Sequence, residues 1–171
     1  GHVVSVRGAD AAHGEMRVLC EVDGQDAATF VLRDQLKRGA RDVFARILGL
    51  GIELSLATGD RREAAERAVS ELGLPLHIEA ECTPEAKLIA IKTRQKAGRV
   101  VGMVGDGIND APALAQADVG LVFTNEARTA ASEAADIALL GGDVEQVWQA
   151  LRISQDTVRV ATQGILLGIG L

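Results

Sequence analysis

The sequence predicts an α/β fold in which a parallel sheet is flanked by helices on both faces. Segments with helical apolar spacing alternate with short apolar runs of the kind that form buried strands, as in βαβ units. Gly51, Gly73 and Gly98 come just after the helical segments, where a left-handed cap is favoured. The strand-like runs are residues 54–57, 76–78, 100–104, 119–122 and 137–140.

The other elements follow from the same patterns. Residues 2–7 and 16–22 alternate apolar and polar side chains, so we expect a pair of strands, and residues 29–32 form a further strand-like run. A long helix is expected from Asp143, and the sequence after Arg159 is almost wholly apolar. Helical apolar spacing is found at Val43, Phe44, Ile47 and Leu48, at Ala64, Ala65, Ala68, Val69 and Leu72, and at Leu88 and Ile91.

Length and composition are typical of one compact domain with short extensions. At 171 residues the chain can bury a sizeable core, which aliphatic side chains must supply because aromatic residues make up only 2%. A net charge of −6 argues against a nucleic-acid partner, which needs clustered Lys and Arg. Cys20 and Cys82 form no C-x-x-C pair, so we expect reduced thiols and no zinc site. Neither a signal peptide nor a run of about eighteen apolar residues is expected.

Residues 100–114 carry the strongest chemical signal. A short apolar run, which predicts a fully buried parallel strand, leads into a loop that holds the carboxylates of Asp106 and Asp110. Ligands of open α/β sheets bind at the carboxyl ends of such strands. Carboxylates there suit Mg²⁺, which takes one or two of them and completes its octahedron with water and phosphate oxygens. Gly105 and Gly107 let the backbone approach closely.

Three other interpretations explain this loop less well. Residues 105–110 begin like the dinucleotide fingerprint G-x-G-x-x-G, but Asp110 replaces the third glycine, and its charge would repel a pyrophosphate. An EF-hand loop needs a glycine that residues 106–111 lack in register. A plain strand-turn-helix, capped by Asp110 with Pro112 in the first turn, leaves the second acid at Asp106 unexplained.

Two further segments supply the cation and the neutral donors that phosphoryl transfer needs. Thr58 follows a strand-like run and precedes a helix expected from Arg61, so its hydroxyl and the Gly59 amide would lie at a helix N-terminus suited to an anion. Lys87 lies in the first turn of a helix opened by Thr83. Taken alone, Thr58 is explained as well by helix capping, and Lys87 by a solvated surface charge.

In this order the motifs resemble those of P-type ATPases, whose phosphorylation domain has the haloacid dehalogenase-like fold. The sequence GDGINDAPALAQADVG, residues 105–120, is similar to the hinge signature of that family. Thr58-Gly59-Asp60 is similar to its TGD motif, and TPEAK, residues 83–87, to the segment that carries its lysine. ASEAADIALLGGDVEQV, residues 131–147, looks most like the heavy-metal-transporting branch. The resemblance covers residues 32–154.

The resemblance implies a role for each motif residue, with Mg²⁺ as the cofactor and ATP bound by the intact protein. Thr58, Gly59 and Lys87 would contact the phosphoryl group of an aspartyl phosphate. Asp106 would bind Mg²⁺ directly. Asn109 and Asp110 would be its partners on the phosphate side and behind the direct ligand. The residues so implied are Thr58, Gly59, Asp60, Lys87 and Asn109 in catalysis, and Asp106 and Asp110 at the metal.

One element of the family pattern is missing. The family phosphorylates the first aspartate of a DKTGT motif at the end of the first strand, and DKTGT does not occur in this sequence. The resemblance therefore implies an incomplete haloacid dehalogenase-like sheet, without that strand and its nucleophile. Asp26 is the nearest imitation, but it has neither the lysine nor the glycine and precedes the run 29–32. Gly39 stands where the segment led by Asp34 usually has a proline, which puts a hinge role for Asp34 in doubt.

The resemblance also divides the chain. Residues 1–31 would be the tail of a nucleotide-binding domain or re-entry strands, 32–153 the phosphorylation domain, and 154–171 the start of a truncated transmembrane helix. A hydrophobic tail that packs on the domain itself is the alternative for the last segment. The partners would be the nucleotide-binding, actuator and membrane domains of the same pump and the transported metal cation. The chain would be a cytoplasmic domain of an integral membrane protein of the plasma membrane.

We therefore expect part of the catalytic phosphorylation domain of an ATP-driven heavy-metal cation transporter, which would not turn over by itself. Two other functions stay open. A stand-alone phosphatase of the same fold would show turnover that disappears in Asp106→Asn. A non-catalytic regulatory module would have kept the fold and lost the nucleophile, and the intact mass from the native source would distinguish it from a fragment.

Overall fold

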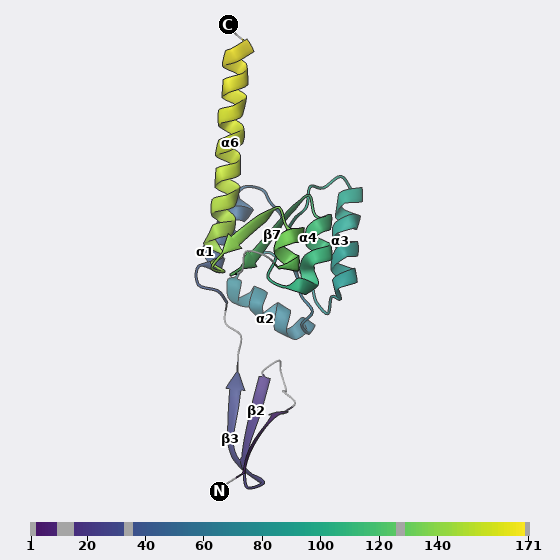
Figure 1. The fold of residues 1–171 in the computed structure, drawn as a ribbon, viewed down its shortest axis with the longest axis vertical. Helices are drawn as coiled ribbons and strands as arrows, with labels where there is room; N and C mark the ends of the chain where they lie inside the picture. Colours follow the sequence, from purple (N-terminus) through teal and green to yellow (C-terminus); the bar gives the residue numbers. More distant parts are fainter. Residues whose placement is uncertain (1–2, 10–15, 33–35, 126–128, 170–171) are drawn as a thin grey trace.

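A computed structural model of the chain describes residues 3–9, 16–32, 36–125 and 129–169. Its first part is an antiparallel sheet of β1 (Val4–Ala9), β2 (Met16–Val22) and β3 (Gln25–Leu32), in the order β1-β2-β3. Figure 1 shows this sheet at the lower end of the molecule. Asp23 and Gly24, with φ of 51° and 77°, form the tight turn between β2 and β3.

The N-terminal strands predicted from alternation are confirmed as β1 and β2, and the run 29–32 is the end of β3. The expectation for Asp26 was wrong. Asp26 does not precede this strand but lies near its beginning, where its backbone pairs with Glu21 beside a register shift. Because the aspartate of DKTGT ends a strand, the likeness of Asp26 to that aspartate is weaker still.

Five parallel strands form two sheets, where the sequence predicts one. β4 (Ser55–Ala57) pairs with β5 (His77–Glu79), and β6 (Gly102–Gly105), β7 (Val119–Thr124) and β8 (Ile137–Leu140) pair in the order β6-β7-β8. Both sheets are parallel, as predicted. Each predicted run overlaps its strand, because short apolar runs bounded by glycine and polar residues mark the strands well.

Helices connect and cover these strands (Figure 1). They are α1 (Ala40–Gly49), α2 (Arg62–Leu72), α3 (Pro84–Lys96), the short 3-10 helix η2 (Ile108–Asp110), α4 (Ala111–Gln116), α5 (Ala130–Ala134) and α6 (Glu145–Ile169). Gly51, Gly73 and Gly98 follow α1, α2 and α3 with positive φ, which confirms the predicted left-handed caps.

The core is aliphatic, as the composition predicts. Val43 and Ile47 on α1 pack against Leu121 of β7 and Val147 of α6 in one buried cluster. On the other face of β7, Val122 joins a second cluster. The buried apolar residues are Ala40, Val43, Ile47, Ala65, Leu72, Ile91, Ala113, Leu114, Leu121, Val122, Ala131, Leu139, Val144 and Val147.

An aspartate directly before β7 and another before β8 set the register of the three-stranded sheet. The carboxylate of Asp118 accepts a hydrogen bond from the Val101 amide at 2.8 Å, and its own amide donates to the Val101 carbonyl at 2.9 Å. Asp136 repeats both contacts with Gly120, at 2.8 and 2.9 Å. The pKa of Asp118 is lowered, because the Val101 amide and the Gln95 side chain stabilise its charged form.

β6 is not the fully buried strand that the sequence predicts. Gly105 is buried, but Val104 is 41% exposed, and Val100, just before the strand, is 85% exposed. Among the described strands, β6 pairs only with β7, and β4 pairs only with β5. β4 and β6 are therefore both edge strands in this structure, and an apolar run cannot distinguish an edge strand from a buried one.

α6 extends well beyond the rest of the molecule (Figure 1). The expected long helix is confirmed, and Asp143 closes its start by accepting the amide of Glu145 at 2.9 Å. Val147 is buried in the core, whereas Ile153 and Ile169 are 66% and 80% exposed, so the end of the helix does not pack on the domain. In the described part of the chain, no helix combines the length and the apolar character needed to cross a membrane.

Candidate active site

The predicted site loops begin at the carboxyl ends of parallel strands. Thr58 follows β4 directly, and Asp106 follows β6 directly. Lys87 lies in the first turn of α3, which leads from the β4–β5 sheet toward β6. Thr83 caps α3 as predicted, because its hydroxyl accepts the amide of Ala86 at 3.2 Å. Each of the three predicted segments is therefore attached to a regular element: the Thr58 segment to β4, the Lys87 segment to α3 and the Asp106 segment to β6.

Lys87 and Asp110 form a direct ion pair. The Nζ of Lys87 lies 2.8 Å from Oδ1 of Asp110, and the two side chains are only 17% and 11% exposed. Charges that are shielded from water in this way interact more strongly than a surface pair. Asp110 occupies the cap position of α4, but its side chain makes no capping hydrogen bond. Helix capping therefore does not explain the carboxylate of Asp110.

Gly105 makes room for the carboxylate of Asp110. A Cβ at Gly105 would lie 3.0 Å from both Cβ and Oδ2 of Asp110, which is closer than side chains tolerate without shifting. A Cβ at Gly107 would meet nothing within 4 Å. The space at Gly105 is therefore occupied by Asp110, whereas the space at Gly107 is open, and the close approach of these two glycines to a ligand stays a prediction.

The Thr58 loop is closed by its own hydrogen bonds. The Thr58 hydroxyl donates to Oδ2 of Asp60 at 2.8 Å and accepts the Asp60 amide at 3.1 Å. The expectation that Thr58 and Gly59 lie at a helix N-terminus was wrong, because α2 begins at Arg62 and its cap residue, Arg61, is extended. A turn stabilised by Thr58 and Asp60, rather than the first turn of a helix, presents the Gly59 amide.

Backbone hydrogen bonds hold the Thr58 loop beside the segment that enters α3. The Cys82 amide donates to the Thr58 carbonyl, and the Glu81 amide donates to the Asp60 carbonyl, both at 2.9 Å. A Cβ at Gly59 would make ordinary contact, 3.6 Å, with the Cys82 carbonyl oxygen. The TGD segment therefore lies next to the start of the helix that carries Lys87.

Asp106 and Asn109 are exposed, in contrast to Asp110. The described residues contain no group of three or more His, Cys, Asp and Glu side chains that could hold a metal ion. This donor set fits Mg²⁺ bound through one carboxylate, water and phosphate, and does not fit a closed zinc cage. Asp106 offers the open carboxylate, because Oδ1 of Asp110 is already paired with Lys87.

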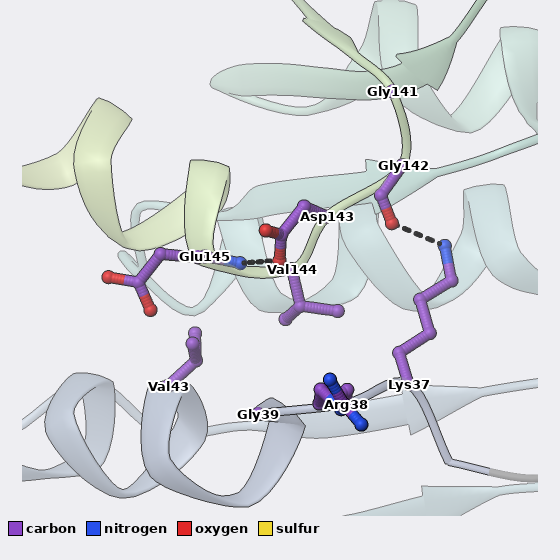
Figure 2. A pocket seen from close by; sticks show the side chains of 9 residues that line it. All are labelled: Lys37, Arg38, Gly39, Val43, Gly141, Gly142, Asp143, Val144 and Glu145. Carbon is purple, nitrogen blue, oxygen red and sulfur yellow. Dashed lines mark hydrogen bonds between the residues drawn. The ribbon is translucent and has the colours of Figure 1, made fainter.

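A hollow lies between the start of α1 and the loop from β8 to α6, and none of the predicted site residues lines it (Figure 2). The Nζ of Lys37 donates to the Gly142 carbonyl at 3.1 Å and lies 4.5 Å from the centre of the Phe123 ring. Nearby, the Arg46 guanidinium pairs with both carboxylate oxygens of Glu145. The sequence did not indicate these contacts, because they join residues about a hundred positions apart, where local spacing carries no information.

A family model described as haloacid dehalogenase-like hydrolase matches residues 5–118, more than half of the chain. The chain is 39% identical over 159 residues to a copper-exporting P-type ATPase of Bacillus subtilis, a match that covers 93% of this chain and 20% of the relative. It is 38% identical over 143 residues to a copper-transporting ATPase of Helicobacter pylori, covering 84% of this chain and 19% of the relative.

Two solved structures of metal-transporting ATPases also superpose on the chain. A crystal structure of a zinc-transporting PIB-type ATPase superposes with a TM-score of 0.78 at 28% identity, over 95% of this chain and 28% of that one. A second crystal structure of such an ATPase, in another state, superposes with a TM-score of 0.66 at 31% identity, over 81% of this chain and 25% of that one. The chain spans about a fifth of the length of the curated relatives it matches. Because the family model matches more than half of the chain, the chain belongs to the haloacid dehalogenase-like hydrolases, and its relatives are metal-transporting P-type ATPases.

Proposed function

We propose that this chain is the phosphate-binding and Mg²⁺-binding part of the phosphorylation domain of an ATP-driven heavy-metal cation transporter. The observation that carries the proposal is the shielded ion pair between Lys87 and Asp110, 2.8 Å apart, with the exposed Asp106 four residues before Asp110 in the same loop. An ammonium in this position is a compact charge for an anion, and the pair with Asp110 holds it in place. The neighbouring Thr58 loop supplies neutral donors.

Each predicted residue has a task in this proposal. The Gly59 amide donates to a phosphoryl oxygen, and the Thr58 hydroxyl does so after turning its proton away from Oδ2 of Asp60. The Asp60 amide, which donates to the Thr58 hydroxyl oxygen, keeps that oxygen in place. Lys87 neutralises charge on the phosphoryl group. Asn109 contacts the same group from the other loop.

At the metal position, Asp106 holds Mg²⁺, and Asp110 supports the site through Lys87. When bound, Mg²⁺ neutralises charge on the phosphoryl oxygens. The exposed carboxylate of Asp106 leaves room for the water and phosphate ligands that Mg²⁺ needs.

The nucleophile belongs to a further strand in this proposal. DKTGT does not occur in the sequence, and β4 and β6 each pair with a single neighbour among the described strands. The exposed Val100 and Val104 are the side chains that a strand beside β6 would cover. A strand between the two edges would end beside Thr58 and Asp106, where an aspartate could be phosphorylated.

The similarity to metal-transporting P-type ATPases supports the remaining assignments. We propose that residues 1–31 end a nucleotide-binding domain that binds ATP, and that residues 154–171 begin a transmembrane helix. The partners would be the nucleotide-binding, actuator and membrane domains of one pump and the transported metal cation. The chain would then lie on the cytoplasmic side of the plasma membrane, and by itself it would not turn over.

Titration with inorganic phosphate, with and without Mg²⁺, tests this function. NMR signals of the Thr58 and Gly59 amides should shift with a dissociation constant in the millimolar range, about 4 kcal/mol, only when Mg²⁺ is present. Lys87→Met and Asp106→Asn should each weaken binding about ten-fold, because each removes a charge that faces the anion or the metal. Lys92→Met removes an exposed lysine of the same helix and should change nothing. An affinity that is unchanged in Lys87→Met contradicts the proposal.

Incubation with Mg²⁺ and ATP separates the alternatives. We expect no phosphoenzyme and no hydrolysis. Phosphatase turnover that is lost in Asp106→Asn would identify a stand-alone phosphatase, and a stable acyl phosphate on Asp26 would show that the chain carries its own nucleophile. Absence of both turnover and phosphate binding would favour a non-catalytic regulatory module.

A further inference from the structure

One arginine of α3 holds both strands of the β4–β5 sheet. Nη2 of Arg94 donates to the carboxylate of Glu79 on β5 and, at 3.0 Å, to the hydroxyl of Ser55 on β4. The Arg94 and Glu79 side chains are 34% and 23% exposed, so water screens this pair only in part. Nε2 of His77 also lies 3.7 Å from the Glu79 carboxylate. The planar guanidinium suits two acceptors better than a point charge would.

The same helix is attached to the elements around β6. Gln95 donates from Nε2 to the Gln116 carbonyl at the end of α4, and Gln116 donates from Nε2 to Oε1 of Gln95, both at 2.9 Å. Two turns earlier, Lys87 pairs with Asp110. Lys87 and Arg94 are seven positions apart, so they lie on the same face of the helix, with the buried Ile91 between them. α3 therefore connects the two sheets.

Glu79 links this connection to the Thr58 loop. Its backbone carbonyl accepts the Thr58 amide at 2.9 Å, while its side chain accepts Arg94. Ser55, the other acceptor of Arg94, lies three residues before Thr58 on β4. Arg94 thus contacts both strands that support the Thr58 loop and belongs to the helix that carries Lys87.

We infer that Arg94, through Glu79 and Ser55, is a positioning residue that sets the Thr58 loop relative to Lys87. The inference rests on the proposed function, because it concerns the two halves of one phosphate site. An anion contacted from both halves needs a fixed separation between them, and a small displacement weakens binding strongly. The two sheets share no strand pairing among the described residues, so packing and side-chain contacts maintain that separation. Leu54, directly before β4, packs against the core cluster at the amino end of that strand, and the contacts of α3 hold the sheet through Glu79 and Ser55.

A second arginine provides a matched control. Arg99, just beyond the end of α3, pairs with Glu53, just before β4, at 2.6 Å. These side chains are 61% and 80% exposed, and exposed pairs contribute little. Glu53 lies at the amino end of β4, whereas Thr58 follows its carboxyl end. Removing this pair should therefore leave the site as it is.

Residual dipolar couplings test the inference without any ligand. In the native chain and in Arg99→Met, the backbone amides of α2, α4 and β7 should fit one alignment tensor. In Arg94→Met the α2 amides should need a separate tensor, because the β4–β5 sheet loses its attachment to α3. Circular dichroism checks the fold, and Arg94→Lys, expected to be intermediate, replaces Arg94→Met if that variant does not fold. A single tensor in a folded Arg94 variant overturns the inference.

Affinity for inorganic phosphate in the presence of Mg²⁺ provides the functional readout. Arg94→Met should bind about five-fold more weakly, and Arg99→Met should bind like the native chain. Combining Arg94→Met with Lys87→Met should weaken binding little beyond Lys87→Met alone, because Arg94 acts by placing the Thr58 loop against Lys87. Fully additive losses overturn the inference. Absence of phosphate binding in the native chain refutes the proposed function, whereas the dipolar couplings still decide whether Arg94 positions the loop.

Discussion

The loops after β6 and β4 supply the two halves of the proposed site, and they are held in different ways. In the β6 loop, Asp110 is 8% exposed and paired with Lys87, and Gly105 leaves space for its carboxylate. In the β4 loop, Thr58 is half-buried, Asp60 is exposed, and their side chains bond to each other. A buried side chain, Asp110, anchors the β6 loop in the fold. The β4 loop is held by hydrogen bonds to the segment that enters α3. Changes in the first should therefore affect stability, and changes in the second mainly binding.

Asp110→Ala should have the largest effect. It leaves the ammonium of Lys87 shielded from water without its carboxylate, so we expect a loss of about 3 kcal/mol in the free energy of unfolding. Urea denaturation measures this loss. Adding Lys87→Met to Asp110→Ala should restore at least part of it, because the unpaired charge is gone. A loss under about 0.5 kcal/mol would mean that the pair is an ordinary surface contact.

Gly105→Ala should have the next largest effect. The new methyl group would press on the Asp110 side chain at 3.0 Å, and forcing atoms into a packed site costs about 2 kcal/mol. Gly107→Ala, two residues on in the same loop, meets open space and is the matched control, with an expected change within about 0.5 kcal/mol. Equal losses in the two variants, measured by thermal and urea unfolding, would refute the packing of Asp110 against Gly105.

Asp60→Ala should change stability less, by under about 1 kcal/mol, because the hydrogen bond it removes is open to water. Its effect should be on binding. Without the Asp60 carboxylate the turn that fixes the Thr58 loop loses one of its two side-chain hydrogen bonds, and affinity for phosphate with Mg²⁺ should fall a few-fold in a calorimetric titration. A larger loss of stability than in Gly105→Ala would reverse the contrast between the loops.

Asp118→Asn should have the smallest effect, a change in how stability depends on pH. Asp118 contacts Val101 just before β6. The pKa of Asp118 in the folded chain is lowered from its ordinary value of 3.8, so its carboxylate stabilises the fold above that value. This contribution disappears as pH falls through the lower, folded pKa. Asp118→Asn should therefore flatten the fall of stability with acid below about pH 4, measured by urea unfolding at several pH values. An unchanged slope would contradict the contact with the Val101 amide.

Local patterns predicted the parallel strands, the start of α3 and the ends of α1, α2 and α3. Thr83 and Pro84 mark the start of α3, and Gly73 marks the end of α2, because capping depends on residues that are adjacent in the chain. The same patterns failed for properties that depend on which elements lie side by side in the fold. Val104 belongs to an apolar run, but its exposure depends on which strand lies beside β6, and spacing within the run does not reveal that.

The site shows the same division. Lys87 and Asp110 could be selected from their motifs, but their contact spans 23 positions and required the fold. The motif at Thr58 could be located, but not the turn that Asp60 closes ahead of α2. Arg94 and Glu79 belong to none of the motifs, and either would be taken for a surface charge until α3 is placed against the β4–β5 sheet.

A crystal structure of the chain grown with Mg²⁺ and inorganic phosphate tests the proposed site most directly. We expect the phosphate within about 3 Å of the Gly59 amide and the Lys87 ammonium, with the metal ion on the Asp106 carboxylate. Phosphate bound instead in the hollow beside Lys37, with Lys87 and Asp106 touching neither ion, would contradict the assignment.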